Sequence, residues 1–349
     1  MVKGNDRILR AGGTPYEIGH SLGQRIGPRL AWTVDTYIAQ GPAAFGVIDA
    51  ERLTRETEPW LEGLANRYRQ ELEGLADGTG VPLRRLAEWI YVEACTGTGC
   101  SSVLMTIDGA TWVARNNDIW APDTWGYATI RDHADRIPTL SFGMPGETFT
   151  ATGINRDRLW LHYHFLPGET AADPPEEAWF EFQWMTEALE MCKSLAEVEA
   201  WLHRQPRRGS MLLFAVDGRI GDRAVFECSP TSHCRWPDTG SAILGTNHSI
   251  LGGPEGTPES HRRRAALEHG VQELAASVNS DPAMGLRDLL ADPTVEQHRV
   301  GYGTVYSNVA CPALGCLWAT LGGFPAASCG DWRQIPWPWP GKSKPSGTR

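Results

Sequence analysis

The 349-residue chain has 32 Lys and Arg, 42 Asp and Glu, 41% hydrophobic residues and 21% charged residues, a composition typical of soluble globular proteins. Its formal net charge of -10 argues against binding to nucleic acid or to an anionic membrane, because both require a basic surface. The N-terminus MVKGNDRILRAGG has no apolar stretch of the length of a secretory signal, so we expect a cytoplasmic protein.

Apolar periodicity predicts helices in the first 95 residues. Apolar side chains recur every four residues from Ile18 to Ile38, and again at helical spacing from Leu61 to Leu75, where the pattern ends at Gly78. A third, short helix is expected from Pro82, because proline is favoured in the first turn and the apolar residues after it share one face. We therefore predict a wholly helical N-terminal segment.

Strand patterns begin after residue 100. The segments 101–107 and 111–117 are joined by Asp108-Gly109, a dipeptide that suits a two-residue hairpin turn. A second helical region is predicted at 176–202, in two pieces, because Ser194 and Glu197 form a Ser-x-x-Glu capping box. Further strands are predicted at 139–143, 148–154, 158–166, 211–218, 223–229 and 242–247, and further helices at 259–276 and 282–290.

The C-terminal part contains 31 residues between Arg299 and Asp331 without a charged side chain, long enough to raise the question of a membrane span. The stretch includes Asn308, Pro312, Gly322, Gly323 and Pro325, and its halves TVYSNVA and LGCLWATL instead predict two buried strands. The whole order of elements suits two antiparallel sheets stacked face to face with helices outside, an α+β fold. Residues 336–349 are rich in Pro, Gly and Ser and are predicted to form a flexible tail.

Among the eight cysteines, none has the Cys-x-x-Cys spacing of a zinc or redox site, and disulfides are not expected without a secretory signal. Cys100 stands out because it follows Gly99 where the first strand begins. This position fits a self-cleaving junction in which the thiol attacks the preceding carbonyl and glycine tolerates the strain. The freed α-amine, with a pKa near ~7.7–8.0, then serves as base for its own thiol. The alternative is that Cys100 is one more buried cysteine before a strand.

The segment Arg115-Asn116-Asn117-Asp118 lies one hairpin downstream, so its strand is expected to pair with the strand that Cys100 begins. A guanidinium beside a thiol favours the thiolate, and a carboxylate can hold an α-ammonium group. Arg115 and Asp118 are on opposite faces of a regular strand, so both reach Cys100 only if the strand ends or bulges near Asn117. A surface ion pair is the alternative.

GCSS followed by RNNDIW resembles the cysteine N-terminal-nucleophile (Ntn) hydrolases, which include choloylglycine hydrolases and penicillin V acylases. The segment GGTPYEIGHSLGQRI is similar to the start of the acyl-coenzyme A:6-aminopenicillanic acid acyltransferase branch. The resemblance runs from about residue 10 to 330, through GINRDRLWLHYHFLP, GTNHS, ESHRRR and TVYSNVACPALG. It implies a four-layer αββα sandwich, a helical pro-region at 1–99, a catalytic chain at 100–335 and association of the two chains after self-cleavage.

The resemblance also implies roles for individual residues. Cys100 would be the nucleophile, Asp118 would position its amine, and Arg115 would support the thiolate and the substrate. Asn247 matches the family asparagine whose amide donates to the oxyanion, a contact worth ~2.7–4 kcal/mol in comparable sites.

The arginine run RRR at 262–264 contains a further candidate. Arg262 best fits a family arginine that follows Ser-x in a helix, although Arg263 and Arg264 leave the register open by one. A solvated helix face is the alternative for this run.

His164 is a departure from the family pattern, since the resemblance implies an asparagine at this place in RLWLHYHFL. A neutral imidazole can still donate one hydrogen bond to the oxyanion, and it can also titrate near neutral pH. A packed strand histidine is the alternative, and His162 lies on the same face. Trp120 and Trp125 follow the RNND segment and are candidates for lining an apolar acyl pocket.

We therefore expect an autoprocessed cysteine hydrolase or acyltransferase that forms an acyl-enzyme on Cys100 from a small acyl amide or acyl thioester. No metal or organic cofactor is required, and a homo-oligomer is left open. One alternative is a dedicated acyltransferase or cyclase of a biosynthetic pathway, and another is a non-catalytic binding homologue. The substrate cannot be read from the sequence, because distant side chains build its pocket.

Overall fold

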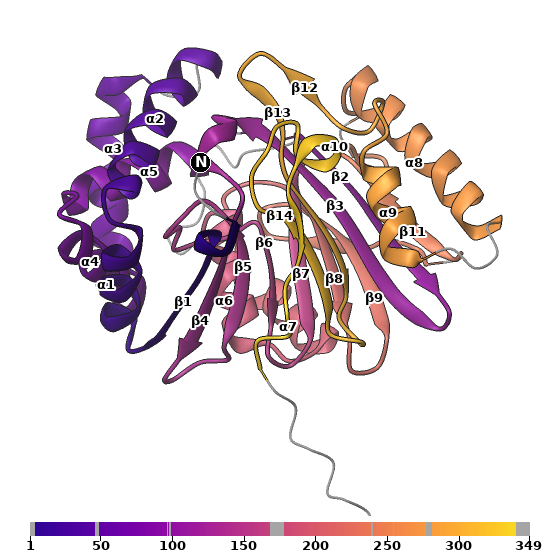
Figure 1. Cartoon of the computed structure of the whole chain (residues 1–349), viewed down its shortest axis with the longest axis horizontal. Helices are drawn as coiled ribbons and strands as arrows, with labels where there is room; N and C mark the ends of the chain where they lie inside the picture. Colours follow the sequence, from indigo (N-terminus) through magenta and orange to yellow (C-terminus); the bar gives the residue numbers. More distant parts are fainter. Residues whose placement is uncertain are drawn as a thin grey trace, which may run out of the picture.

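Two β-sheets form the centre of the computed structural model, which describes residues 4–45, 49–95, 97, 99–167, 178–238, 240–253, 255–276 and 281–339 (Figure 1). Sheet A contains, in spatial order, β1 (Ile8–Gly13), β4 (Tyr127–His133), β5 (Thr139–Gly143), β6 (Thr152–Asn155), β7 (Leu159–Phe165), β8 (Met211–Asp217), β9 (Asp222–Cys228) and β10 (His233–Arg235). Sheet B contains β11 (Ala242–Gly245), β2 (Gly99–Ile107), β3 (Ala110–Trp120), β13 (Tyr302–Cys311), β14 (Cys316–Thr320) and β15 (Trp332–Gln334), with β12 (His298–Arg299) paired to β13.

The helices lie at the two outer faces and along one side of the sheets (Figure 1). They are η1 (Gly4–Arg7), α1 (Pro15–Ile26), α2 (Pro28–Phe45), α3 (Ala50–Gly63), α4 (Asn66–Thr79), α5 (Leu83–Ala94), η2 (Pro122–Thr124), α6 (Glu181–Met191), α7 (Leu195–Arg204), α8 (Pro258–Ala276), α9 (Pro282–Leu290) and α10 (Ala326–Cys329).

The N-terminal segment differs from the wholly helical prediction. Residues 8–13 form strand β1, which pairs in parallel with β4 at the edge of sheet A. The periodicity from Ile18 to Ile38 is split between α1 and α2, because Gly27 adopts a positive φ of 57° and Pro28 cannot continue the hydrogen bonding of α1. The later apolar pattern is likewise divided between α3 and α4, whereas the helix predicted after Pro82 is confirmed as α5.

Most later predictions are confirmed. The β2–β3 hairpin turns at Asp108 and Gly109, both with positive φ, as a two-residue turn of this type requires. The helix pair at α6 and α7 is confirmed, with the Ser194 side chain accepting from the Glu197 backbone N–H. The predicted start of the first of these helices, at 176–177, lies outside the described residues. The uncharged C-terminal stretch forms strands β13 and β14, and strand β4 was not predicted.

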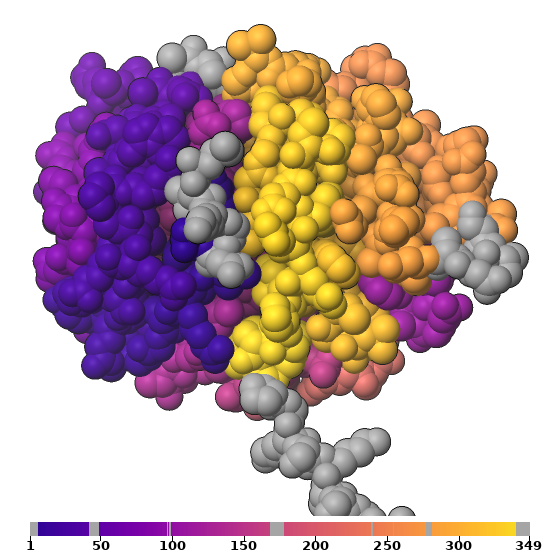
Figure 2. All heavy atoms as spheres, in the orientation of Figure 1, coloured from indigo at the N-terminus to yellow at the C-terminus, as the bar shows by residue number. Residues whose placement is uncertain are grey.

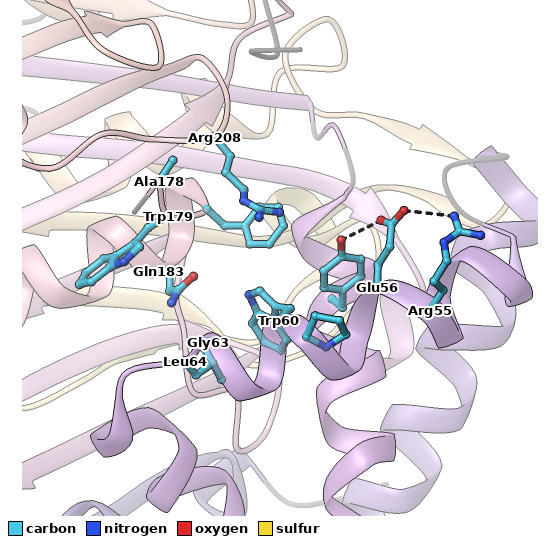
Figure 3. Close-up of a pocket in the computed structure, with 12 residues that line it drawn as sticks. Arg55, Glu56, Trp60, Gly63, Leu64, Ala178, Trp179, Gln183 and Arg208 are labelled. Atoms are coloured by element: carbon cyan, nitrogen blue, oxygen red, sulfur yellow. Dashed lines mark hydrogen bonds and ion pairs between the residues drawn. The ribbon is translucent and has the colours of Figure 1, made fainter. Parts of the chain in front are cut away.

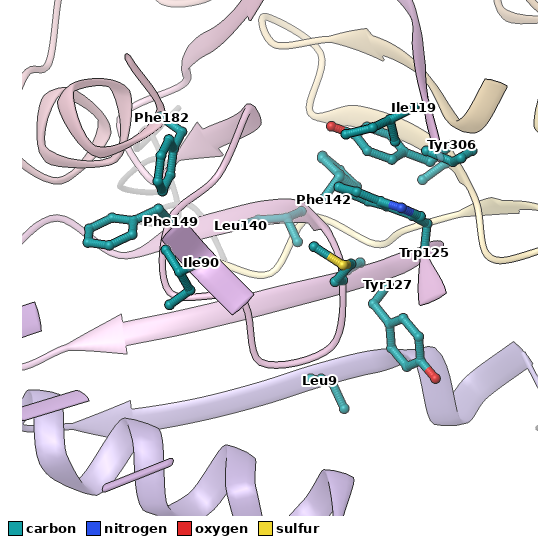
Figure 4. Packing of buried hydrophobic residues seen from close by; sticks show 14 of the residues in the cluster. Leu9, Ile90, Ile119, Trp125, Tyr127, Leu140, Phe142, Phe149, Phe182 and Tyr306 are labelled. Atoms are coloured by element: carbon teal, nitrogen blue, oxygen red, sulfur yellow. The ribbon is translucent and has the colours of Figure 1, made fainter. Parts of the chain in front are cut away.

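Three hydrophobic clusters establish the predicted four-layer αββα sandwich. One joins the outer face of sheet A to α6 and α7, and another joins the outer face of sheet B to α8 and α9. The largest fills the space between the sheets and continues under the N-terminal helices. Figure 4 shows part of it, with Leu9 of β1, Ile90 of α5, Leu140 of β5 and Tyr306 of β13.

The two ends of the described chain lie against each other. Figure 2 shows the N-terminal region in indigo beside the C-terminal strands in yellow, and the Arg7 guanidinium lies close to Gly322. Of the predicted tail, residues 336–339 belong to the packed structure, because Trp339 is buried and its indole N–H donates to Asp132. Residues 340–349 lie outside the described residues. No helix of the described chain is long and apolar enough to cross a bilayer.

Candidate active site

Cys100 is the second residue of β2, and its neighbours come from the paired strand β3. In the ladder Gly99 pairs with Asp118, Cys100 with Asn117, and Ser102 with Arg115. Since paired residues of an antiparallel ladder share a face, Cys100, Asn117, Ser102 and Arg115 have side chains on one face, toward sheet A. Asp118 has its side chain on the opposite face, toward α8.

The Cys100 thiol is fully buried and lies beside a buried guanidinium. One terminal nitrogen of Arg115 is 3.5 Å from Sγ, and the thiol lies 3.7 Å from the Asn117 Oδ1 atom. The same nitrogen donates to Asn117 Oδ1 at 2.8 Å and to the Tyr163 carbonyl at 2.9 Å, while the other donates to the Ala151 carbonyl and the Thr152 hydroxyl. Arg115 is thus held by neutral acceptors, and its charge can stabilise negative charge that develops on sulfur.

The Asp118 side chain lies on the other face of β3, away from the Cys100 thiol. Its Oδ1 accepts from Thr304 at 2.7 Å, and its Oδ2 lies 3.7 Å from an Arg263 nitrogen. Complete burial raises the pKa of Asp118 to about 6, although the Arg263 charge opposes this rise. The expected bulge near Asn117 occurs instead on the partner strand, where the β13 register shifts between Thr304 and Tyr306.

Glycine is required at position 99 because a side chain would not fit there, and not because of the backbone φ angle. Its φ is not in the left-handed region, but a Cβ atom here would lie 2.7 Å from Tyr302 Oη and 3.1 Å from Asp118 Oδ2. The Gly99 N–H donates to Tyr302 Oη at 3.1 Å. A larger residue before Cys100 would therefore push the junction away from Asp118.

Asn247 follows β11 and contacts the backbone of Cys100. Its Oδ1 accepts from the Cys100 N–H at 2.8 Å and from Arg263 at 2.9 Å, while its Nδ2 donates to the Phe165 carbonyl at 2.8 Å. The Ser260 hydroxyl accepts from the Asn247 backbone N–H. In the continuous chain the side-chain oxygen of Asn247, not its amide nitrogen, thus faces the nitrogen of Cys100.

Arg263, not Arg262, is the arginine at the site. Arg262 is exposed on α8, whereas Arg263 is buried and donates to the Cys100 carbonyl and to Ser101 Oγ in addition to Asn247. The buried face of α8 consists of Ser260, Arg263, Leu267 and Val271. The apolar residues at 267 and 271 share this face at four-residue spacing, so helix phase could have selected Arg263 from the sequence.

His164 is near the site but engaged in other contacts. Its Nε2 atom is 2.7 Å from Ser102 Oγ, and its Nδ1 atom is 2.8 Å from the Thr246 carbonyl. Burial lowers the pKa of His164 well below its usual range, and the Arg115 charge acts in the same direction. The structure therefore differs from the expectation that His164 titrates near neutral pH, and both ring nitrogens have protein partners.

Trp120 and Trp125 belong to the hydrophobic core. Their exposures are 1% and 2%, and both rings pack against Tyr37 of α2. Their indole N–H groups donate to the carbonyls of Tyr37 and Trp120, respectively. The structure therefore places both rings in the packed core, against Tyr37 of α2 and, for Trp125, also against Tyr306 of β13.

A cavity of about 720 Å³ lies between the N-terminal helices and the segment that leads into α6 (Figure 3). At one wall, Arg55 and Tyr91 both hydrogen-bond to the Glu56 carboxylate. The walls are formed by residues that come before Gly99 in the sequence and by residues that come after Cys100. They are Arg55, Glu56, Pro59, Trp60, Gly63, Leu64, Tyr91, Ala178, Trp179, Phe180, Gln183 and Arg208.

Sequence reasoning missed three residues that contact the predicted site, Asn117, Ser102 and Tyr302, and left Arg263 open as an alternative to Arg262. Asn117 was present in the RNND motif, but its contact with the thiol depends on the β2–β3 register.

All eight cysteines are free, and the described residues contain no group of three or more His, Cys, Asp or Glu side chains that could hold a metal.

Comparison with solved structures finds similarity at low sequence identity. An ortholog of N-acylethanolamine-hydrolyzing acid amidase from Caenorhabditis elegans is 13% identical with a TM-score of 0.49, over 68% of this chain and 100% of that chain. A conjugated bile acid hydrolase from Clostridium perfringens is 12% identical with a TM-score of 0.42, over 68% and 96%. Penicillin V acylase from Agrobacterium tumefaciens is 12% identical with a TM-score of 0.44, over 68% and 86%. No protein-family model and no curated protein sequence matches the chain.

Proposed function

We propose that the protein is an autoprocessed cysteine hydrolase or acyltransferase that cleaves a small acyl amide or thioester through an acyl-enzyme on Cys100. The observation that carries the proposal is the convergence of four polar side chains on the junction between Gly99 and Cys100. Arg115 contacts the Cys100 sulfur, Asn247 contacts its backbone nitrogen, and Asp118 and Arg263 lie on the other side of its strand.

The first step is cleavage of the chain before Cys100. The thiolate adds to the Gly99 carbonyl carbon, the carbon–nitrogen bond breaks, and the nitrogen takes a proton, which leaves a thioester between Gly99 and the Cys100 sulfur. Water then hydrolyses this thioester and yields a Gly99 carboxylate and a free Cys100 α-amine. The Cys100 nitrogen is already hydrogen-bonded to Asn247, and Asp118 lies beside Gly99 to hold the new ammonium group.

The catalytic cycle repeats the same chemistry on a bound substrate. The α-amine takes the thiol proton, the sulfur adds to the substrate carbonyl, and the amine returns the proton to the leaving nitrogen. Arg115 stabilises the charge on sulfur. After the chain has been cleaved before Cys100, Asn247 supports the oxyanion. Water gives hydrolysis, whereas a second amine gives acyl transfer.

Association of the two chains after cleavage has a physical basis in buried contacts across the junction. Strand β1 stays paired with β4, and the buried Arg131 of sheet A hydrogen-bonds Glu71 of α4 at 3.0 Å. The two parts also share one hydrophobic core, so their separation would expose a large apolar surface to water and is unfavourable.

Mass spectrometry of the purified protein tests the proposal. We expect two chains that correspond to residues 1–99 and 100–349, and an intact chain for Cys100→Ala. The matched control is Cys95→Ala, five residues upstream, which should be cleaved as the wild type is. An intact wild-type chain whose Cys100 does not take up an acyl group would refute the proposal.

A non-catalytic binding protein with the same sandwich is the second candidate. It is favoured only by His164, whose two ring nitrogens are both hydrogen-bonded within the protein. It predicts neither cleavage nor acylation of Cys100. A dedicated acyltransferase or cyclase forms the same acyl-enzyme, and it is distinguished by product analysis with and without an added amine.

A further inference from the structure

A continuous line of buried polar groups crosses from sheet A to sheet B behind the Cys100 thiol. The Trp160 indole nitrogen is 2.8 Å from His162 Nδ1, and His162 Nε2 is 2.9 Å from Ser102 Oγ. Ser102 Oγ is 2.7 Å from His164 Nε2, and His164 Nδ1 is 2.8 Å from the Thr246 carbonyl. All five residues are essentially inaccessible to solvent.

The two ends of this line fix the direction of every hydrogen bond. The Trp160 indole can only donate, so His162 Nδ1 accepts, and a neutral His162 then carries its proton on Nε2. The Thr246 carbonyl can only accept, so His164 carries its proton on Nδ1 and accepts at Nε2. Ser102 accepts from His162 and donates its one hydroxyl proton to His164. Each donor and acceptor in the line is used once.

The end of the line is the peptide group that precedes Asn247. His164 holds the Thr246 carbonyl, and the carbonyl of the next residue in β7, Phe165, accepts from the Asn247 side chain at 2.8 Å. The end of β7 therefore clamps both the backbone before Asn247 and its side chain. Asn247 Oδ1 in turn meets the Cys100 nitrogen at 2.8 Å.

We propose that His164 and Ser102 are positioning residues, which act through the Thr246 carbonyl to hold Asn247 against Cys100. This inference rests on the proposed function and goes beyond it, because it assigns His164 a role through Asn247 and not a contact with the reacting carbonyl. A neutral histidine with its proton on Nδ1 can fill this role, whereas an apolar ring of the same shape cannot.

His164→Phe is the main test. The phenyl ring keeps the stacking with Phe214, whose centroid is 4.5 Å from that of His164, but it leaves the Thr246 carbonyl without a donor. The matched control is His162→Phe, since His162 lies on the same strand and face and stacks on Phe214 at 4.6 Å, but its ring contacts Trp160 and Ser102, not Thr246.

Two reactions of Cys100 separate positioning from general damage. Burst acylation by a p-nitrophenyl acyl ester requires oxyanion support, whereas alkylation by iodoacetamide requires only a reactive thiol. We expect His164→Phe to lower the acylation rate at least about tenfold, and by no more than the ~10²–10³ that the loss of an oxyanion donor costs, with an almost unchanged alkylation rate. His162→Phe removes the donor to Ser102 but leaves the hydrogen bond between His164 and Thr246, so its acylation rate should fall by less than that of His164→Phe.

Two further variants keep the test decisive if His164→Phe does not fold. In His164→Asn the side-chain NH2 group takes the place of Nδ1–H and can donate to Thr246, so this variant should recover acylation relative to His164→Phe. Ser102→Ala removes the donor to His164 and frees its ring, so acylation should fall by less than in His164→Phe. Equal acylation in His164→Asn and wild type, together with a slow Ser102→Ala, supports the clamp.

The proposal is overturned if acylation and alkylation fall together in His164→Phe and Ser102→Ala, or if His162→Phe is as slow as His164→Phe. Histidine nitrogen NMR gives a readout independent of activity: His162 protonated on Nε2 and His164 on Nδ1 at neutral pH supports the assigned direction, and any other pair of tautomers overturns it. A wild-type protein without any acylation refutes the proposed function, whereas a normal wild type with a normal His164→Phe refutes only the clamp.

Discussion

Arg262 and Arg263 are adjacent on α8, and the structure predicts opposite consequences for their loss. Arg263 is 3% exposed, lies 3.7 Å from Asp118 and donates to Ser101 and Asn247 at 2.9 Å each. Arg262 is exposed. We compare Arg263→Met with Arg262→Met, because both changes remove the same charge and keep a similar side-chain length.

The expected loss for Arg263→Met is large because it leaves a buried carboxylate without its counter-charge. Breaking a buried pair by removing one partner costs about 3–5 kcal/mol. With an unfolding entropy of about 2.1 cal/mol/K per residue, this corresponds to a decrease in Tm of about 4–7 °C for 349 residues. For Arg262→Met we expect a change within about 0.5 kcal/mol, as for other exposed positions.

Calorimetry of both variants in a Cys100→Ala background measures these changes on an uncut chain. The loss for Arg263→Met should be smaller at pH 5 than at pH 8, because Arg263 lowers the pKa of Asp118 and its removal lets the buried carboxyl become neutral. In the Cys100 chain, Arg263→Met should also slow cleavage, since the Cys100 carbonyl and Asn247 lose a donor.

Equal Tm values for the two variants would refute the assignment of the buried arginine. A larger loss for Arg262→Met would contradict the burial of Arg263 and would place Arg262 on the inner face of α8. An Arg263→Met loss that does not depend on pH would refute the coupling to Asp118.

Asn247→Ala should fold and lose about 10²–10³ in the rate of Cys100 acylation, and unchanged labelling by an acyl ester would contradict its role. Gly99→Ala should slow cleavage, because its Cβ would lie 2.7 Å from Tyr302 Oη; a wild-type cleavage rate by mass spectrometry would argue against this close fit. Burial raises the pKa of Glu147 to about 7, and burial with the neighbouring Glu147 raises that of Glu93 as well. Because these folded-state values exceed the unfolded value, the stability from the protonated pair is present below about pH 4.5 and is lost as the pH rises through about 7. Glu147→Gln should therefore flatten the decrease in Tm between pH 5 and pH 8, and an unaltered pH profile would refute the assignment.

Local sequence signals predicted the elements that local chemistry determines. Asp108-Gly109 specifies its hairpin through two positive φ angles, and Ser194 caps α7 through its own hydroxyl. Strand β1 could not be found in this way, because residues 8–13 become a strand through pairing with β4, more than 110 residues later. Its sequence ILRAGG is too short and too poor in apolar alternation to indicate a strand alone.

The residues of the candidate site also divide into those that nearby sequence predicts and those whose partners are distant in sequence. Cys100, Arg115 and Asp118 were predicted from motifs close in sequence, and their ladder pairing follows from one hairpin. The partners of His164 could not be predicted, because Ser102 and Thr246 reach it from sheet B across the molecule. Residue type alone suggested a titratable donor, whereas burial between two sheets favours a neutral ring.

The edge strand β1 has a practical consequence for the expression of residues 100–349 alone. A gene that begins at residue 100 would encode sheet A without the strand that pairs with β4 along residues 128–133. The exposed backbone of β4 would then offer open N–H and C=O groups to other molecules, which is a known route to aggregation. We therefore expect folded protein from the full-length gene or from co-expression of residues 1–99 with residues 100–349, because β1 completes the edge of sheet A.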